Sequence, residues 1–199
     1  MMKKMNCKLA FGVLAGGKSS RMGQNKSRLI LAGRPFLEII LQAGAYFSER
    51  IVSFSKEETA DYMFCFQSAG ILTVQDTVSD TGPLEGIRQI LLRTSCPACL
   101  VTATDMPFLT AAFLSDFASL YRGSGNLALT FEGRPEPLCS IYCRDCLEAI
   151  EELQRIQIHR PAALFSMVST QYVSLESMGY SSDVIQNIND AEEYRKLLR

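Results

Sequence analysis

The stretch Phe11–Leu29, which reads FGVLAGGKSSRMGQNKSRL, constrains this chain more than any other. An apolar run over residues 9–14 stops at Gly16-Gly17, and the residues that follow carry four cations and no carboxylate: Lys18, Arg21, Lys26 and Arg28. A buried strand that ends in a glycine-rich, cationic loop is how parallel α/β sheets present backbone N–H groups and positive charge to phosphates. The stretch therefore predicts a phosphate-binding loop after the first strand of such a sheet.

Length, charge and hydropathy limit what the rest of the chain can be. With 199 residues, 47% hydrophobic and 21% charged, we expect a single globular domain over residues 1–199. The net charge of −1 argues against a broad nucleic-acid surface, and no apolar run approaches the roughly 20 residues of a membrane span. The N-terminal segment superficially resembles a short signal peptide, but its brief apolar run leads straight into the charged loop, so we interpret it as a strand. We expect a cytoplasmic protein.

Seven cysteines are scattered along the chain, and their odd number fits reduced thiols. Two groups could suggest zinc or an iron–sulfur cluster: Cys96-Pro-Ala-Cys99, and Cys139 with Cys143 and Cys146. The second group lies where a strand is expected to run into a helix, in an apolar setting, and the chain has a single histidine. We therefore interpret these cysteines as small core residues.

Strands and helices are expected to alternate along the chain. Apolar periodicity and turn residues predict strands at 8–14, 50–54, 71–74, 98–103, 126–131, 138–143 and 172–175. They predict helices at 35–47, 57–68, 84–92, 110–121, 145–154, 160–166 and 191–198, with Thr110 and Asp190 as N-caps. This order is typical of the α/β class, here a Rossmann-like, mostly parallel sheet with helices on both faces and a late hairpin-like strand pair.

Ligands of such a sheet bind beyond the carboxyl ends of its strands. The residues that follow the first four expected strands are glycines, small hydroxyl residues and two acids: residues 15–17, residues 53–55, Asp76 and Asp105. Carboxylates that face a basic phosphate loop are what a magnesium–nucleotide site requires. The sequence therefore predicts such a site at this edge.

Two other nucleotide-binding patterns compete for the loop. Gly12–Ser19 matches the phosphate-loop expression G-x-x-x-x-G-K-[ST], with Asp105 as a candidate magnesium partner. In a true phosphate loop, however, residues 13–16 would leave the strand and curl round a phosphate, whereas the apolar run continues to Leu14. The dinucleotide fingerprint G-x-G-x-x-G fits less well, because the glycines at 12, 16, 17 and 23 are spaced differently. These mismatches make Lys18 a weaker candidate for phosphate binding than the cations further along the loop.

The longer pattern L-A-G-G-x-S-x-R-M-G-x-x-K, from Leu14 to Lys26, closely resembles the signature of the molybdenum cofactor guanylyltransferases, the MobA family of the nucleotidyltransferase superfamily. The resemblance continues in the same order at residues 82–86 (GPLEG), 104–108 (TDMPF) and 187–190 (NIND), so it covers essentially the whole chain. The first motif is specific, and the other three are weak singly and persuasive together.

The resemblance implies roles for individual residues. It assigns GTP binding to Leu14, Ala15, Gly16, Gly17, Lys26, Ser53, Asp76 and Asp105, with Lys26 on the phosphates. It gives Asp105 the magnesium ion, and it places Arg160, Asn187 and Asn189 on the acceptor side. Ser53 stands where some members have an asparagine, and Glu85 stands where a small residue is more usual.

Elementary chemistry points to the same loop. Nucleotidyl transfer brings two polyanions together and expels pyrophosphate, so positioned cations and a metal ion supply most of the catalysis. Arg21 suits the leaving phosphates through its bidentate fork, and Lys26 does so as a movable point charge. With Asp105, these are the expected catalytic residues. The acceptor is already an anionic phosphate, so no general base is needed, which fits a chain with one histidine.

The resulting hypothesis is a Mg²⁺-dependent enzyme that transfers GMP from GTP to molybdopterin and releases pyrophosphate, with a transient partner enzyme that delivers the pterin. Gly16 favours guanine by resemblance, because cytidylyl members of the family tend to have Ala-Gly in place of Gly16-Gly17. The alternatives are a cytidylyltransferase of the same pathway, another nucleotide transferase of the same fold, a phosphate-loop ATPase or kinase, and a non-catalytic nucleotide-binding module.

Overall fold

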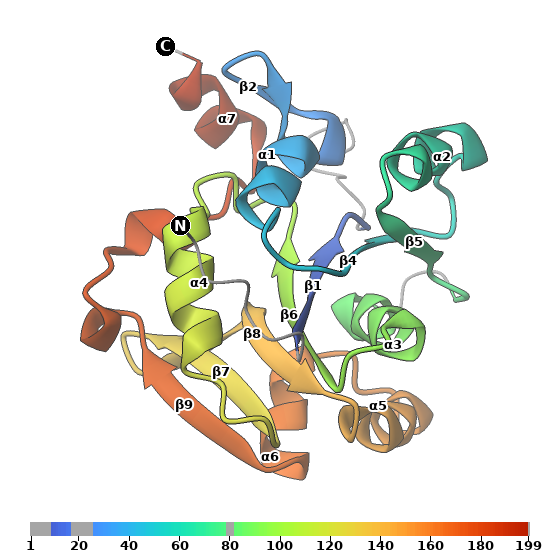
Figure 1. The fold of residues 1–199 in the computed structure, drawn as a ribbon, viewed down its shortest axis with the longest axis vertical. Coiled ribbons are helices and arrows are strands. Elements are labelled where there is room, and N and C mark those ends of the chain that lie inside the picture. The colour runs from blue at the N-terminus through green and yellow to red at the C-terminus, as the bar shows by residue number, and fades with distance from the viewer. Residues whose placement is uncertain (1–8, 17–25, 79–81, 199) are drawn as a thin grey trace.

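A seven-stranded sheet in the order β5-β4-β1-β6-β8-β7-β9 forms the centre of the molecule (Figure 1). The computed structural model describes residues 9–16, 26–78 and 82–198. The strands are β1 (Leu9–Leu14), β4 (Arg50–Phe54), β5 (Leu72–Gln75), β6 (Ala98–Ala103), β7 (Asn126–Phe131), β8 (Arg134–Cys143) and β9 (Thr170–Ser174). All neighbours pair in parallel except β8, which is antiparallel to both β6 and β7. The expected mostly parallel α/β fold is confirmed.

Helices cover both faces of the sheet, as Figure 1 shows. The longer ones are α1 (Phe36–Ala43), α2 (Ala60–Ser68), α3 (Pro83–Arg93), α4 (Ala111–Ser119), α5 (Cys146–Arg155) and α7 (Ala191–Leu197), and α6 (Leu164–Met167) is a single turn. Alternate residues of β1 face opposite sides: Phe11 packs where α1 ends at Gly44, whereas Gly12 packs against Ile90 of α3. Because α4 packs on α1 and α5 packs on α3, these two pairs lie on opposite faces.

Local sequence signals account for the ends of several helices. Thr110 caps α4 by accepting a hydrogen bond from the Phe113 backbone N–H, and Asp190 caps α7 by accepting from the backbone N–H groups of Glu192 and Glu193. Both caps were predicted from the sequence, and both satisfy donors that the first helical turn leaves unpaired. The helix expected from residue 35 to 47 ends earlier, at Ala43, and the one expected from residue 57 begins only at Ala60.

The structure corrects three further expectations. A short hairpin, β2 (Ile30–Leu31) with β3 (Arg34–Pro35), was missed; its turn is Ala32-Gly33, both with positive φ. β8 begins at Arg134 and not at residue 138, because the chain turns at Glu132-Gly133. Its prolines are tolerated because β6 pairs only with residues 139–143, so the start of β8 has one neighbour instead of two. The helix expected at 160–166 is a 3₁₀ turn, Pro161–Ala163, followed by α6.

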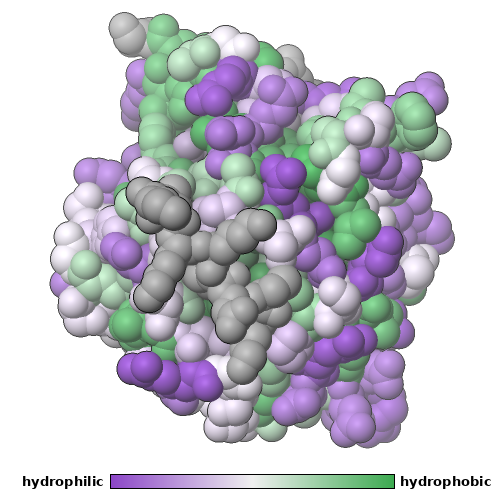
Figure 2. Space-filling view, viewed as in Figure 1, coloured by the Kyte–Doolittle hydropathy of each residue, from purple (hydrophilic) through white to green (hydrophobic). Residues whose placement is uncertain are grey.

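The cysteines behave as predicted in the described part of the chain. Cys96, Cys99, Cys139, Cys143 and Cys146 are buried free thiols, and Cys65 is a free thiol at the surface. Within the same residues, no helix combines the length and apolar character that crossing a membrane would require. Figure 2 shows hydrophilic and hydrophobic residues interspersed on the face in view, a mixture that is ordinary for a protein surface.

A second, small core joins the C-terminal segment to the start of the chain. Leu29, Phe36 and Ile188 form it, and Tyr194 of α7 packs against it. The Tyr194 hydroxyl also donates to the carbonyl oxygen of Ile30, at 2.8 Å. Figure 1 shows α7 beside β2 at the top of the molecule. This docking brings residues 187–190 to the edge of the sheet where β1 and β6 end.

Candidate active site

Four parallel strands end at one edge of the sheet, and each carries a residue expected in the site at or just after its end. β5 leads to Asp76, β4 contains Ser53 near its end, β1 leads to Ala15-Gly16, and β6 leads to Asp105. Backbone hydrogen bonds continue past the strand ends, from Ala15 N–H to Ser53 O at 2.7 Å and from Thr104 N–H to Leu14 O at 3.1 Å. The strands that follow β1 along the chain lie on both of its sides: β4 and β5 on one side, and β6 on the other. The strand order therefore changes direction at β1. Such a switch point is where open α/β sheets bind ligands.

A three-residue polar cluster lies at the end of β6. The Lys26 ammonium group donates to Asp105 Oδ2 at 2.8 Å and to Asn189 Oδ1 at 3.4 Å. The Lys26 and Asp105 side chains are 21% and 17% exposed, so the pair is mostly shielded from water but reachable. The cluster joins residues that are far apart in the sequence: Lys26 lies 79 residues before Asp105 and 163 residues before Asn189.

The backbone secures this cluster from two sides. The Ile188 backbone N–H donates to the carbonyl oxygen of Asp105 at 2.8 Å, which ties the residue between Asn187 and Asn189 to the end of β6. The Asn189 N–H donates to Glu193 Oε2 at 2.6 Å, so α7 also orients this turn. Ile188 is fully buried in the second core. Asn187 is half-buried one residue earlier.

Asp105 keeps one oxygen atom without a partner. Its Oδ1 atom is buried and has no hydrogen bond to any described residue. A buried, unpaired carboxylate oxygen is costly unless a ligand satisfies it. Over the described residues, no group of three or more His, Cys, Asp or Glu side chains could hold a metal ion. Mg²⁺ at nucleotide sites commonly takes one or two carboxylates, with phosphates and water as its other ligands. Asp105 therefore fits a magnesium ion that binds together with a nucleotide.

Asp76 lies on the opposite side of β1 from Asp105 and is linked to Ser53. The Ser53 hydroxyl, in a side chain only 1% exposed, donates to Asp76 Oδ1 at 3.2 Å. Burial raises the pKa of Asp76 to about 6; the Ser53 hydrogen bond opposes this, and the charges of Glu85 and Glu57 add to it. The structure thus brings Ser53 to the site through Asp76.

Close backbone approach explains two glycines of the site. A Cβ atom at Gly16 would lie 3.0 Å from the Ser55 backbone nitrogen and 3.5 Å from Asp76 Oδ2. A Cβ atom at Gly86 would lie 2.7 Å from Leu14 Cδ2 and 3.2 Å from Ser53 Oγ. Glycine at both positions therefore lets the loop after β1 lie against β4 and lets α3 pack directly on the strand ends.

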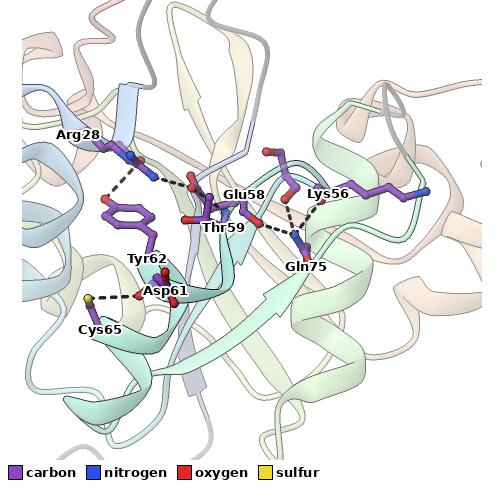
Figure 3. Close-up of polar contacts among 10 residues, drawn as sticks. Arg28, Lys56, Glu58, Thr59, Asp61, Tyr62, Cys65 and Gln75 are labelled. Atoms are coloured by element: carbon purple, nitrogen blue, oxygen red, sulfur yellow. Dashed lines mark hydrogen bonds and ion pairs between the residues drawn. The ribbon is translucent and has the colours of Figure 1, made fainter.

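The segment after Lys26 is anchored by a network that the sequence did not reveal. Arg28 donates to Glu58 Oε1 at 2.6 Å, and its guanidinium lies 4.1 Å from the centre of the Tyr62 ring. The Gln75 side-chain amide donates to the backbone carbonyls of Ser55, Lys56 and Glu58. Figure 3 shows these contacts between the Arg28 segment, the start of α2 and the end of β5. Arg28 therefore anchors its segment to Glu58 and Tyr62, whereas Lys26 contacts Asp105 and Asn189 at the end of β6.

The remaining candidate residues are placed less closely or not at all. Arg160 is exposed and follows His159, whose backbone carbonyl oxygen lies against Gly82 at the beginning of α3. This brings its segment near the β5–α3 connection, and within the described residues no hydrogen bond or ion pair joins Arg160 to Lys26 or Asp105. Gly17 and Arg21 lie outside the described residues, so their expected roles stay predictions.

The strand itself removes the phosphate-loop alternative. Gly12, Val13 and Leu14 pair with Ile51, Val52 and Ser53 in an uninterrupted parallel ladder, and also with Val101, Thr102 and Ala103 on the other side. Residues 13 and 14 therefore belong to the sheet and cannot curl round a phosphate, as the expression starting at Gly12 demands.

Comparison with known proteins agrees with this geometry. Residues 12–170 match the family described as "MobA-like NTP transferase domain". A probable molybdenum cofactor guanylyltransferase of Pelotomaculum thermopropionicum is 31% identical over 179 residues, which cover 86% of this chain and 82% of that protein. One of Clostridium perfringens, strain SM101, is 31% identical over 200 residues, covering 96% and 97%.

Solved structures share the fold. Molybdopterin-guanine dinucleotide biosynthesis protein A of Archaeoglobus fulgidus superposes with a TM-score of 0.76 at 21% identity, covering 94% of this chain and 96% of that one. A nucleotidyl transferase of Methanothermobacter gives a TM-score of 0.74 at 19% identity, covering 95% of each chain. The motif resemblance, the strand-end site and the family match over most of the chain agree, and the chain belongs to the MobA-like NTP transferase family.

Proposed function

We propose that this protein transfers GMP from GTP to molybdopterin in a Mg²⁺-dependent reaction, releases pyrophosphate and forms the guanine dinucleotide cofactor. Family membership supports nucleotidyl transfer, and the relatives named as probable molybdenum cofactor guanylyltransferases support the choice of substrates. The observation that carries the proposal is the cluster of Lys26, Asp105 and Asn189 at the end of β6, next to the loop that follows β1.

The metal ion has one natural ligand in this site. The unpaired Oδ1 atom of Asp105 would hold Mg²⁺, with phosphate oxygens and water as its other ligands. The bound ion would neutralise charge that builds up on the phosphates during transfer. Lys26 supports the same task because its ammonium group already lies 2.8 Å from Asp105 and can reach a phosphate held there. Arg21 is proposed as a second cation for the leaving phosphates.

The nucleotide is proposed to lie along the ends of β1, β4 and β5. Leu14, Ala15, Gly16 and Gly17 would contact the base through their backbone, where the tight approach of Gly16 to Ser55 leaves no room for a side chain on that side. Asp76 would accept a hydrogen bond from the nucleoside, and Ser53 would orient its carboxylate. Asn187 and Asn189 are proposed for the acceptor on the side of β1 where β6 lies, and Arg160 is proposed for the acceptor from its segment near the start of α3.

We place the reaction in the cytoplasm, where a transient partner enzyme would hand over the pterin. Pyrophosphate release from GTP, CTP and ATP tests the function, measured with and without molybdopterin, with and without MgCl₂, and with the dinucleotide product identified by mass. GTP with both additions is expected to give the highest rate. A preference for CTP would make the protein a cytidylyltransferase, and nucleotide binding without transfer would make it a non-catalytic module.

A further inference from the structure

A buried carboxylate on the first turn of α3 acts on Asp76 of the candidate site through its charge. Glu85 is only 1% exposed. Its Oε1 atom accepts hydrogen bonds from the Thr77 hydroxyl at 2.7 Å, the Thr77 backbone N–H at 3.3 Å and the Gln89 amide at 2.7 Å. Its Oε2 atom accepts from the Gln154 amide of α5 at 2.9 Å. One carboxylate therefore joins the end of β5 to two helices.

These hydrogen bonds keep Glu85 ionised inside the protein. Burial raises the pKa of Glu85, but the hydrogen bonds from Gln89, Thr77 and Gln154 together outweigh burial, so the pKa lies below its ordinary value. The Arg88 guanidinium, at 3.8 Å, is a weak additional partner. A buried charge costs several kcal/mol unless it is compensated in this way. Such a costly group marks a position where orientation matters, since an apolar side chain would stabilise the helix packing more simply.

Thr77 connects Glu85 to the candidate site. It follows Asp76 directly, its side chain is exposed, and both its backbone N–H and its hydroxyl donate to Glu85. On the other side, the Asp76 backbone N–H donates to Phe54 O at 2.9 Å and its carboxylate accepts from Ser53. Asp76 is therefore held by hydrogen bonds to β4, and its neighbour Thr77 is held by hydrogen bonds to Glu85 of α3. Because Thr77 is exposed, its position depends on these hydrogen bonds and not on packing.

We propose that Glu85 is a positioning residue of the nucleotide site, which acts through Thr77 to hold the Asp76 carboxylate in the orientation that receives the nucleotide. This inference rests on the proposed function, because it takes Asp76 as a nucleotide contact.

The charge of Glu85 acts on the Asp76 carboxyl through space, and this effect has to be separated from positioning through Thr77. Among the described residues, the charged groups that act on Asp76 are Glu85 of α3 and Glu57 of the β4–α2 loop, while Ser53 and Gly16 bring no charge. Glu85 raises the pKa of Asp76 together with burial, so Glu85→Gln is expected to lower it. Thr77→Val leaves the charge of Glu85 in place and removes only the hydroxyl donor.

Three variants test the inference: Glu85→Gln, Thr77→Val and the conservative Thr77→Ser. Thr77 is exposed, so its variants are expected to fold even if Glu85→Gln does not. A matched control is Gln154→Ala, which removes a hydrogen bond to Glu85 without touching Thr77. The Asp76 carboxyl is titrated by NMR without any substrate, and KM for GTP and kcat are measured at pH 7.5.

Thr77→Val should raise KM for GTP about tenfold with little change in kcat, the effect of one lost hydrogen bond to a charged group. Glu85→Gln removes the charge that strengthens this bond, so it should lower the Asp76 titration midpoint and raise KM in the same direction. Thr77→Ser and Gln154→Ala should keep KM near the wild-type value. The inference is overturned if the wild type turns over GTP and both Thr77→Val and Glu85→Gln lower only the melting temperature. A wild type that does not turn over GTP overturns the proposed function. In that case a shifted Asp76 midpoint in Thr77→Val, which keeps the charge of Glu85, supports the link through Thr77, and an unshifted midpoint overturns it.

Discussion

Removal of the Lys26 side chain is the most direct test of the proposed chemistry. Its ammonium group lies 2.8 Å from Asp105, and both side chains are about four-fifths buried. At that distance, with an effective dielectric constant of about 20, a full opposite charge attracts the ammonium group by about 6 kcal/mol before desolvation is subtracted. A phosphate in the same place would interact similarly. Lys26→Ala is therefore expected to reduce kcat by about 10²–10³-fold, the usual loss for one positioned donor at a developing negative charge.

The assay is pyrophosphate release at saturating GTP, MgCl₂ and molybdopterin. Lys196→Ala is the matched control, because Lys196 also forms an ion pair, with Glu192 at 3.0 Å, but both side chains are about 70% exposed. We expect this control to keep about the wild-type rate, since exposed pairs contribute at most about 1 kcal/mol. The free energy of unfolding of both variants is measured in urea. A Lys26→Ala enzyme with the activity of Lys196→Ala, or one whose lost activity follows its lost stability, would refute the reasoning.

Three further predictions follow from the structure. Asp105→Asn should lower kcat about 10²–10³-fold and should not be rescued by excess MgCl₂, whereas the surface variant Asp61→Asn should be unaffected; wild-type transfer by Asp105→Asn would remove the metal assignment. Because burial raises the pKa of Asp76 to about 6, the folded state binds a proton that the unfolded state has lost between about pH 4 and 6, so this group lowers stability as pH rises through that window. The rise of about two units in the pKa of Asp76 corresponds to at most about 3 kcal/mol, and water reduces this because Asp76 is only half-buried. Asp76→Asn should therefore raise the free energy of unfolding in urea by about 1 kcal/mol at pH 7.5 and by little at pH 4, and an equal gain at both would contradict it. A Cβ atom at Gly44 would lie 2.2 Å from the buried Phe11 ring, so Gly44→Ala should destabilise the fold by about 1–3 kcal/mol, measured by thermal unfolding, and an unchanged melting temperature would show that the ring can move.

The sequence predicted the elements that depend on local patterns. The alternation of strands and helices, the N-caps Thr110 and Asp190, and the end of β1 at Leu14 all come from neighbouring residues, and all are observed. The β2–β3 hairpin was missed because its strands are two residues each and carry too little periodicity to detect. The dipeptide Ala32-Gly33 is only a weak turn signal in the sequence. Both residues have positive φ in the structure, a conformation that alanine rarely adopts.

In the candidate site, too, some features follow from the sequence and others appear only in the structure. Strand ends in a parallel sheet share an edge, so the sequence could place Asp76 and Asp105 at one rim from chain order alone. The sequence could not predict the Arg28–Glu58–Tyr62 network or the hydrogen bonds of Glu85 to Thr77 and Gln154. These contacts join different elements, and no local sequence pattern shows which elements lie close together in space.

The sequence by itself therefore determined which residues form strands and helices, which family the loop after β1 resembles, and which edge of the sheet carries polar groups. Only the tertiary structure decided that Lys26, Asp105 and Asn189 meet within hydrogen-bond distance and that one Asp105 oxygen stays unpaired. The physical reason is the distance along the chain over which each kind of interaction acts. Propensity, capping and periodicity act over a few residues, whereas that contact spans up to 163 residues and depends on the packing of Ile188 with Leu29 and Phe36.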